Sequence, residues 1–447
     1  MMRLCSNDLK LFCITDRLPE STIACVHALT GHVFKLSLKH DLLCDMMVDV
    51  YNPYKKMGLR RVINGATCLT RLGGSIAHPD VFEAMKDASM SFVQIPELQA
   101  WAGKKIAAAT GAEAGLPTAG ANNALMLAAA ACIMKNTELE QYDPLKLETW
   151  SHITLRVPAH LEGYPTEFIV QKNNRFIYDH AVECVGGRFI EVGGAAGATE
   201  EELDLAYDPG RIAAYYYTVR SAAASSPLEL IIEAAHRNGV PVIVDAAAEL
   251  PPRTKLTQYI EMGVDLVIFS GGEYLGGPNN SGILAGRKDL VKLAHLQAYP
   301  FHGVGRASKL SRETIVGFVK ALEIYLRKDE KSEYEKWMVK AEHIAEQIGQ
   351  IPGVNTGIGY HKTIEEEIPM APVCILELDA GKFSITAKEL VETLRDGDPS
   401  IEILLEPGFL LHEPEGKIAV NPEFMLEGDA EIVITRITKL LSSHLVS

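Results

Sequence analysis

The stretch VDLVIFSGGEYLGGPNNSGILAG, residues 264–286, carries the strongest indication of the fold. Its run DLVIFS (265–270) is apolar almost throughout, which is typical of a strand covered on both faces in a parallel sheet. The run ends in Ser-Gly-Gly, and Glu273 follows directly. Because open α/β sheets bind ligands beyond the carboxyl ends of their strands, we expect Glu273 to lie in a pocket.

The chain on either side alternates apolar strand-like runs with helix-like runs. This alternation predicts an α/β domain with a mainly parallel sheet over residues 51–326. Further strands are expected at RFIEVGG (188–194), AAYYYTV (213–219), VPVIVDA (240–246) and SGILAG (281–286), and a crossover helix at LELIIEAAHRNG (228–239). A charged helix at about 311–350 leads onward, so that residues 327–447 form a linking helix and a small α/β C-terminal domain.

Residues 1–50 show no clear period. We expect them to form an N-terminal arm, which either packs on a partner subunit or extends upstream of the true translation start. The beginning of the chain is interrupted by charged residues before any long apolar core, which argues against a secretory signal. We therefore expect a cytoplasmic location.

Composition narrows the classes of partner. The 447 residues are 47% hydrophobic and carry a formal net charge of −15. Since an acidic surface repels phosphate backbones, no nucleic acid is expected as a partner. The longest apolar run (124–134) is shorter than the roughly 20 residues that span a bilayer, so no membrane is expected either. The eight cysteines form no CxxC pair, which favours reduced thiols over disulfides or zinc.

Two further features of the sequence could bind a ligand. Asp245 ends the strand VPVIVDA, where it either faces the pocket or caps the following turn. Earlier in the chain, the backbone turns at Gly120 into a helix that begins near Ala121. The first N–H groups of this helix either hold an anion or form a plain N-terminal cap, and Asn122 and Asn123 could add side-chain donors.

Six segments resemble the fold type I pyridoxal-phosphate enzymes related to bacterial selenocysteine synthase and to D-glucosaminate-6-phosphate ammonia-lyase. They are RRVINGATCLTRLGG (60–74), TGAEAGLPTAGANNALMLAAAAC (110–132), YDHAV (178–182), VIVDAAAELPP (242–252), FSGGEYLGGPNNSGIL (269–284) and GRASKLSRETIVGFVKALE (305–323). The resemblance covers nearly everything from residue 51 onward. It implies a fold type I aminotransferase-like α/β fold and a homodimer or larger assembly with active sites near the subunit interface.

The resemblance also implies roles for individual residues. Asp245 matches the aspartate that pairs with the pyridinium nitrogen of the cofactor. Residues 120–122 match the loop that holds the cofactor phosphate, although the family usually has Ser-Gly-Ala-Ala there. His180 would lie near the ring face as an acid–base candidate, Arg306 near the substrate, and Ser270 among the cofactor-binding residues.

Glu273 stands where the family has the lysine that forms the Schiff base. A lysine can form an imine with the cofactor aldehyde and carry a proton, whereas a glutamate can only move the proton. A carboxylate beside the aldehyde also disfavours the anionic cofactor unless the carboxylate is protonated or paired. We therefore expect no covalent pyridoxal phosphate at residue 273; the closest downstream candidate for a substitute, Lys309, belongs to another element.

Three functions stay open. In the first, the chain binds Mg²⁺ or Mn²⁺ through Asp245, Glu249, Glu273 and His180. The metal then assists a lyase, isomerase or epimerase, which moves a proton next to a carbonyl of a small polar acid or sugar derivative. In the second, a lyase or transferase holds pyridoxal phosphate or pyridoxamine phosphate without a covalent bond, and Glu273 moves the proton. In the third, the chain is a non-catalytic, ligand-binding descendant.

Three basic residues are candidates for binding the small-molecule substrate. His302 and Arg306 lie in a glycine-containing loop, YPFHGVGRAS, and such a loop can reach a carboxylate or phosphate. The alternative for Arg306 is a salt bridge between subunits. Arg175, in NNRFIYDHA, has the same two interpretations.

Overall fold

The computed structural model describes residues 52–146, 157–219, 225–362, 369–406 and 414–446. By its contacts the chain divides into two units, residues 1–61 and 62–447. The predicted arm, residues 1–50, lies outside the described residues. In the described part of the first unit, a short 3₁₀ helix, Lys55–Met57, ends at Gly58.

The larger sheet of the second unit has seven strands in the order β2-β8-β7-β6-β5-β3-β4. The bounds are β2 (Ala114–Thr118), β8 (Gly282–Gly286), β7 (Leu266–Ser270), β6 (Val242–Asp245), β5 (Ile212–Thr218), β3 (Glu167–Gln171) and β4 (Arg188–Val192). The strands from β7 to β4 pair in parallel, and β8 is antiparallel to both of its neighbours. The predicted, mainly parallel sheet is therefore confirmed.

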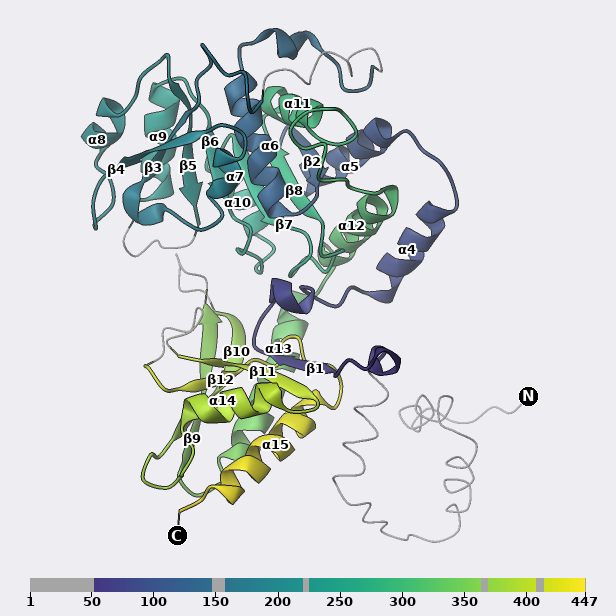
Figure 1. Ribbon diagram of the computed structural model, residues 1–447, viewed down its shortest axis with the longest axis vertical. Coiled ribbons are helices and arrows are strands. Elements are labelled where there is room, and N and C mark those ends of the chain that lie inside the picture. Colours follow the sequence, from purple (N-terminus) through teal and green to yellow (C-terminus); the bar gives the residue numbers. More distant parts are fainter. Residues whose placement is uncertain (1–51, 147–156, 220–224, 363–368, 407–413, 447) are drawn as a thin grey trace. The chain divides into compact units, whose positions relative to one another are not determined.

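Helices cover both faces of this sheet (Figure 1). One core contains residues of α5 (Ile95–Thr110), α9 (Leu228–Arg237), α10 (Lys255–Glu261) and α12 (Arg312–Tyr325), and the other contains residues of α6 (Ala121–Met134), α7 (His180–Glu183) and α11 (Lys288–Gln297). Strand β5 shows why both faces are needed: Tyr215 and Tyr217 enter the first core and Tyr216 the second. Side chains alternate along a strand, so a strand that is apolar throughout must be covered twice.

Helix α6 is the long apolar run of the sequence. From Asn123 to Met134 all but one of its residues are buried, because the helix lies between the sheet and α7 and α11. A helix that is apolar on all sides needs such a buried position. Among the described residues, no helix is both long enough and apolar enough to cross a membrane.

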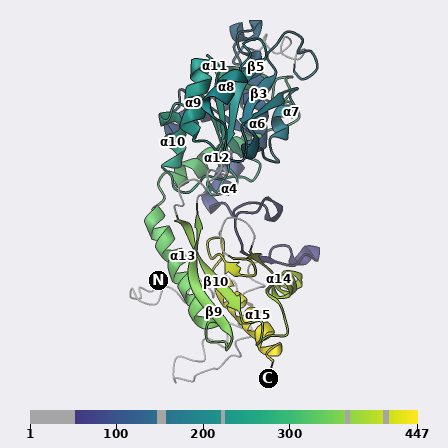
Figure 2. The same cartoon turned by 90° about the vertical axis from the view of Figure 1, so that its left-hand side faces the viewer.

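The second sheet has five strands in the order β1-β11-β12-β10-β9. The bounds are β1 (Val62–Gly65), β11 (Ser400–Leu405), β12 (Ile418–Val420), β10 (Pro369–Leu378) and β9 (Val354–Lys362). Helix α13 (Glu330–Ile348) packs on β9 and β10 (Figure 2). It also lies beside α15 (Asp429–Ser443), where the His343 Nε2 is 2.6 Å from the Glu431 Oε1. Helix α14 (Ala387–Asp396) packs on β11. Strand β1 pairs with β11, so this sheet contains a strand from the sequence before residue 326, where we predicted the C-terminal part to begin. The domain boundaries themselves stay a prediction.

The single charged helix expected at 311–350 is two helices, α12 and α13. The side chain of Asp329 accepts a hydrogen bond from the Ser332 N–H and so begins α13 as an N-cap. Helix α12 buries one side against α5 and α4 (Pro79–Ser89).

Candidate active site

Asp245 lies at the carboxyl end of β6, as predicted, and its side chain is buried. Its Oδ1 accepts a hydrogen bond from the Ala247 N–H at 3.1 Å. Burial raises the pKa of Asp245 to about 6; the Ala247 hydrogen bond opposes this rise and the charge of Asp179 adds to it. No ion pair joins Asp245 to a cation within the described ranges. A buried carboxyl group in this state favours a ligand that brings a positively charged N–H.

Glu273 follows the neighbouring strand β7 in the glycine-rich turn. Its backbone C=O accepts a hydrogen bond from the Gly276 N–H at 2.9 Å, which closes the turn. Burial raises the pKa of Glu273 to about 7, the Ser270 hydroxyl opposes the rise, and the charge of Asp245 adds to it. A carboxyl group with a pKa near neutrality can both take and return a proton at physiological pH.

The start of α6 has the geometry of an anion site. Gly120, the N-cap, has φ 89° and ψ 166°, a conformation that only glycine adopts readily. The Ala124 N–H donates to the Gly120 C=O, which leaves the N–H groups of residues 121–123 without partners inside the helix. Asn122 is exposed, whereas Asn123 is buried, and its Oδ1 accepts from the Ala119 N–H at 3.1 Å. The buried Nδ2 of Asn123 has no hydrogen-bond partner, so it can serve an incoming anion.

These features fit pyridoxal phosphate or pyridoxamine phosphate. Asp245 offers a buried carboxyl group to a pyridinium N–H, and residues 120–123 offer helix N–H groups and an amide to a phosphate.

Arg175 and His180 lie between β3 and β4 in the chain, on either side of Asp179. His180 begins the short helix α7 and is exposed, with its Nδ1 3.6 Å from the Sγ of Cys184. Arg175 donates to Asp179 and to Glu191, at 2.7 Å each. The guanidinium of Arg175 is therefore already held by carboxylates, and its role in binding substrate stays a prediction.

Asp179 is a residue that the sequence analysis did not select, although it stands next to His180. It is buried, and its Oδ1 has no hydrogen-bond partner. Burial raises its pKa, and its charge acts on Asp245. In the sequence, Asp179 stands in YDHAV, directly before His180. An aspartate at that position does not by itself indicate a functional residue.

The loop between α11 and α12 holds the other basic candidates. The guanidinium of Arg306 lies 5.1 Å from the centre of the Tyr299 ring, and its side chain is half-buried. His302 and Lys309 are exposed. Contact with substrate stays a prediction for Arg306 and His302.

The predicted metal ligands do not come together. Within the part of the chain that the structure describes, no group of three or more His, Cys, Asp or Glu side chains is placed to hold a metal ion. His180 is exposed on α7, while Glu249 is buried and accepts a hydrogen bond from the Tyr259 hydroxyl of α10 at 3.4 Å. The metal site inferred from Asp245, Glu249, Glu273 and His180 is therefore not supported by the described side chains.

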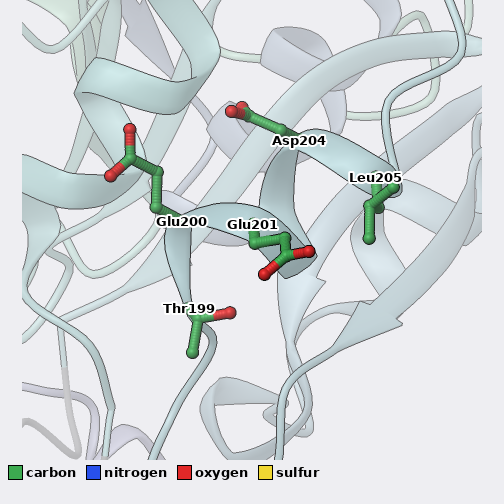
Figure 3. Close-up of a pocket in the computed structure, with 5 residues that line it drawn as sticks. All are labelled: Thr199, Glu200, Glu201, Asp204 and Leu205. Carbon is green, nitrogen blue, oxygen red and sulfur yellow. The ribbon is translucent and has the colours of Figure 1, made fainter.

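A separate hollow lies at α8 (Glu200–Leu205), beside the β4 end of the sheet (Figures 1 and 3). It is lined by Thr199, Glu200, Glu201, Asp204 and Leu205. The side chain of Thr199 caps α8, and Arg237 forms ion pairs with Glu200 and Asp204 at 3.1 Å each. None of the predicted site residues lines this hollow.

Comparisons with known proteins agree with this arrangement. Residues 223–348 match the family model SelA, L-seryl-tRNA selenium transferase. The chain is 29% identical to a 5'-C-glycyluridine monooxygenase-decarboxylase of Streptomyces sp over 88% of this chain and 92% of that protein. It is 27% identical to the D-glucosaminate-6-phosphate ammonia lyase of Salmonella typhimurium over 87% of this chain and 98% of that protein.

Solved structures of pyridoxal-phosphate enzymes share this fold. A D-glucosaminate-6-phosphate ammonia-lyase superposes with a TM-score of 0.73 and 26% identity, covering 88% of this chain and 98% of that one. A ureidoglycine-glyoxylate aminotransferase from Bacillus subtilis shares the fold at a TM-score of 0.50 and 12% identity, covering 86% of this chain and 94% of that one. The chain thus has the fold type I, aminotransferase-like fold of pyridoxal-phosphate enzymes and is similar in sequence to selenium transferases and an ammonia lyase.

Proposed function

We propose that the chain is a lyase that holds pyridoxal phosphate or pyridoxamine phosphate without a covalent bond and uses Glu273 to move a proton. Its substrate would be a small polar acid or sugar derivative. The observation that supports this most is the pair of carboxyl groups at the ends of β6 and β7, the buried Asp245 and the half-buried Glu273, with pKa values raised to about 6 and about 7. The likeness to a D-glucosaminate-6-phosphate ammonia lyase favours a lyase over an isomerase or epimerase.

Each residue has a separate task in this proposal. Asp245 pairs with the ring N–H, and the start of α6 with Asn123 binds the phosphate. When bound, the cofactor supplies an electron sink for the negative charge that develops on carbon. Glu273 takes the proton from the carbon next to the carbonyl or imine carbon and later returns it or releases it to solvent. The Ser270 hydroxyl, beside Glu273, stabilises the ionised form of that base.

Binding of the cofactor can be tested by absorbance. Titrating the purified protein with pyridoxal phosphate and, separately, pyridoxamine phosphate is expected to give saturable spectral changes with both, because neither needs a lysine. Asp204→Asn, on the exposed helix α8, is the matched control and should bind as the wild type does. A protein that binds neither compound would refute the proposal in favour of a different ligand.

A further inference from the structure

The peptide bond that precedes Glu273 is held by a residue from outside its own turn. The C=O of Gly272 accepts two hydrogen bonds from Ser75, one from the N–H at 3.1 Å and one from the hydroxyl at 3.3 Å. The two residues are 197 positions apart in the sequence, so only folding makes this contact. Because a peptide group is planar, fixing this C=O also fixes the N–H and the Cα of Glu273, from which its side chain starts.

Gly74 makes this contact possible. Gly73 and Gly74 have φ 94° and 76°, values that favour glycine, and they follow the 3₁₀ helix Thr70–Leu72. Gly74 is buried, and a Cβ on it would lie 2.3 Å from the Gly272 oxygen and 2.8 Å from the Asn279 Oδ1. Since an ordinary contact needs about 3.4 Å, a side chain at residue 74 would have to open a gap of about 1 Å.

The turn itself is closely packed. A Cβ on Gly272 would lie 2.5 Å from the Asn279 Cα. The Gly271 N–H donates to the Ser281 C=O at 2.9 Å, and the Gly277 N–H donates to the Gly271 C=O at 2.9 Å. Gly272 therefore has little room to move without the turn, and the proposed base is part of that turn.

The segment that carries Ser75 is also anchored in the second sheet. Arg71 donates two hydrogen bonds to the carboxylate of Glu402, from Nη1 to Oε1 at 2.8 Å and from Nη2 to Oε2 at 2.9 Å. Glu402 is buried and lies on β11, which pairs with β1. A two-point contact of this kind fixes direction as well as distance. Residues 71–75 therefore join β11 to the turn of the proposed base.

We propose that Ser75 is a positioning residue, which holds the Gly272 C=O so that the Glu273 carboxyl group is presented to the carbon-bound proton of the substrate. The inference rests on the proposed lyase function, because a base must lie within hydrogen-bond reach of the proton that it removes. Ser75 acts through the backbone of the turn and takes no part in the proton transfer itself. Gly74 is required because its lack of a side chain allows the contact.

The two adjacent glycines give a matched pair of variants. Gly73→Ala and Gly74→Ala both place an alanine at a positive φ, so both carry the same kind of backbone strain. Only Gly74→Ala meets the Gly272 oxygen, because nothing lies within 4 Å of a Cβ on Gly73. The difference between the two variants therefore reports the contact with the turn.

The first measurement is deuterium exchange at the carbon next to the carboxylate of D-glucosaminate 6-phosphate, at saturating concentration in D₂O, in the full chain loaded with pyridoxal phosphate. We expect Gly74→Ala to exchange about 10- to 100-fold more slowly than Gly73→Ala, because a misplacement of about 1 Å can reduce a rate that much. Ser75→Ala loses the hydroxyl and keeps the N–H bond, so exchange should fall by only about 2- to 10-fold.

Binding of pyridoxamine phosphate separates positioning from a general loss of structure. All three variants should bind it as the wild type does, because none of them changes Asp245 or the start of α6. Equal exchange rates in Gly73→Ala and Gly74→Ala would overturn the assignment. A loss of binding in Gly74→Ala that matches its loss of exchange would overturn it too.

An infrared titration of the full chain, before cofactor is added, tests the position of Glu273 apart from turnover. In the wild type the band of the protonated carboxyl group should disappear as the pH passes about 7, and Glu273→Gln identifies the band. Gly74→Ala should move this step toward 4.5, because a displaced turn takes the carboxyl group out of its half-buried position, whereas Gly73→Ala should keep it at about 7. A step at the same pH in both variants would overturn the positioning role. A wild-type protein that exchanges no deuterium would instead count against the proposed function.

Discussion

Two acidic regions of this molecule have the same chemistry and opposite surroundings. At α8, Glu200 and Asp204 are exposed and share Arg237 at 3.1 Å each. At the ends of β6 and β7, Asp245 and Glu273 have raised pKa values and no cation of their own among the described residues. A paired surface acid is stable as it is, whereas a buried, unpaired acid gains free energy from a bound partner or proton. The difference indicates which region acts on a ligand.

The substitution with the largest expected effect on this comparison is Glu273→Gln. The amide keeps the shape of the side chain and cannot accept a proton, so exchange of the carbon-bound proton should fall by about 10²- to 10⁴-fold. Glu200→Gln is the control and should exchange as fast as the wild type. The measurement is deuterium incorporation by mass spectrometry with the cofactor bound; exchange at the wild-type rate in Glu273→Gln would remove this residue from the mechanism.

Asp245→Asn tests the cofactor partner. Losing a charge-assisted hydrogen bond, worth about 1.5–3 kcal/mol, should weaken binding of pyridoxamine phosphate by about 10- to 100-fold. The dissociation constant can be measured by quenching of intrinsic fluorescence, with Asp204→Asn as the control. Equal affinities in all three proteins would show that Asp245 has a structural role only.

Stability should depend on pH through Glu423. Burial raises its folded-state pKa from the ordinary value of 4.5 to about 8, so the folded state binds the proton more tightly than the unfolded state does. The resulting stability is fully present below about pH 4.5 and is lost as the pH rises through about 8. Each unit of raised pKa corresponds to about 1.4 kcal/mol. Urea unfolding across this pH range should show a smaller decline for Glu423→Gln than for the exposed control Glu427→Gln.

The smallest effect is expected at α8. Asp204→Asn removes one exposed partner of Arg237, and exposed ion pairs contribute little to stability. Thermal unfolding should show no measurable change in midpoint. A clear loss of stability there would mean that the contrast between the two acidic regions is less sharp than their exposure indicates.

The periodicity of the sequence predicted most of the larger sheet, and the position of Asp245 and Glu273 at strand ends followed from it. Strand β2, AGLPT, was not predicted because Gly115 and Pro117 are poor strand residues, and its place at the sheet edge tolerates them. The pairing of β1 with β11 was beyond prediction, since no local pattern encodes contacts between residues so far apart.

The central claim is that the cofactor is held without an imine to the chain. Borohydride reduction of the protein loaded with pyridoxal phosphate, followed by intact and peptide mass spectrometry, tests it most directly, because reduction fixes any imine as a stable amine. We predict that no lysine of the chain, Lys309 included, carries a stoichiometric pyridoxyl group. A stoichiometric pyridoxyl adduct on one lysine would contradict the account.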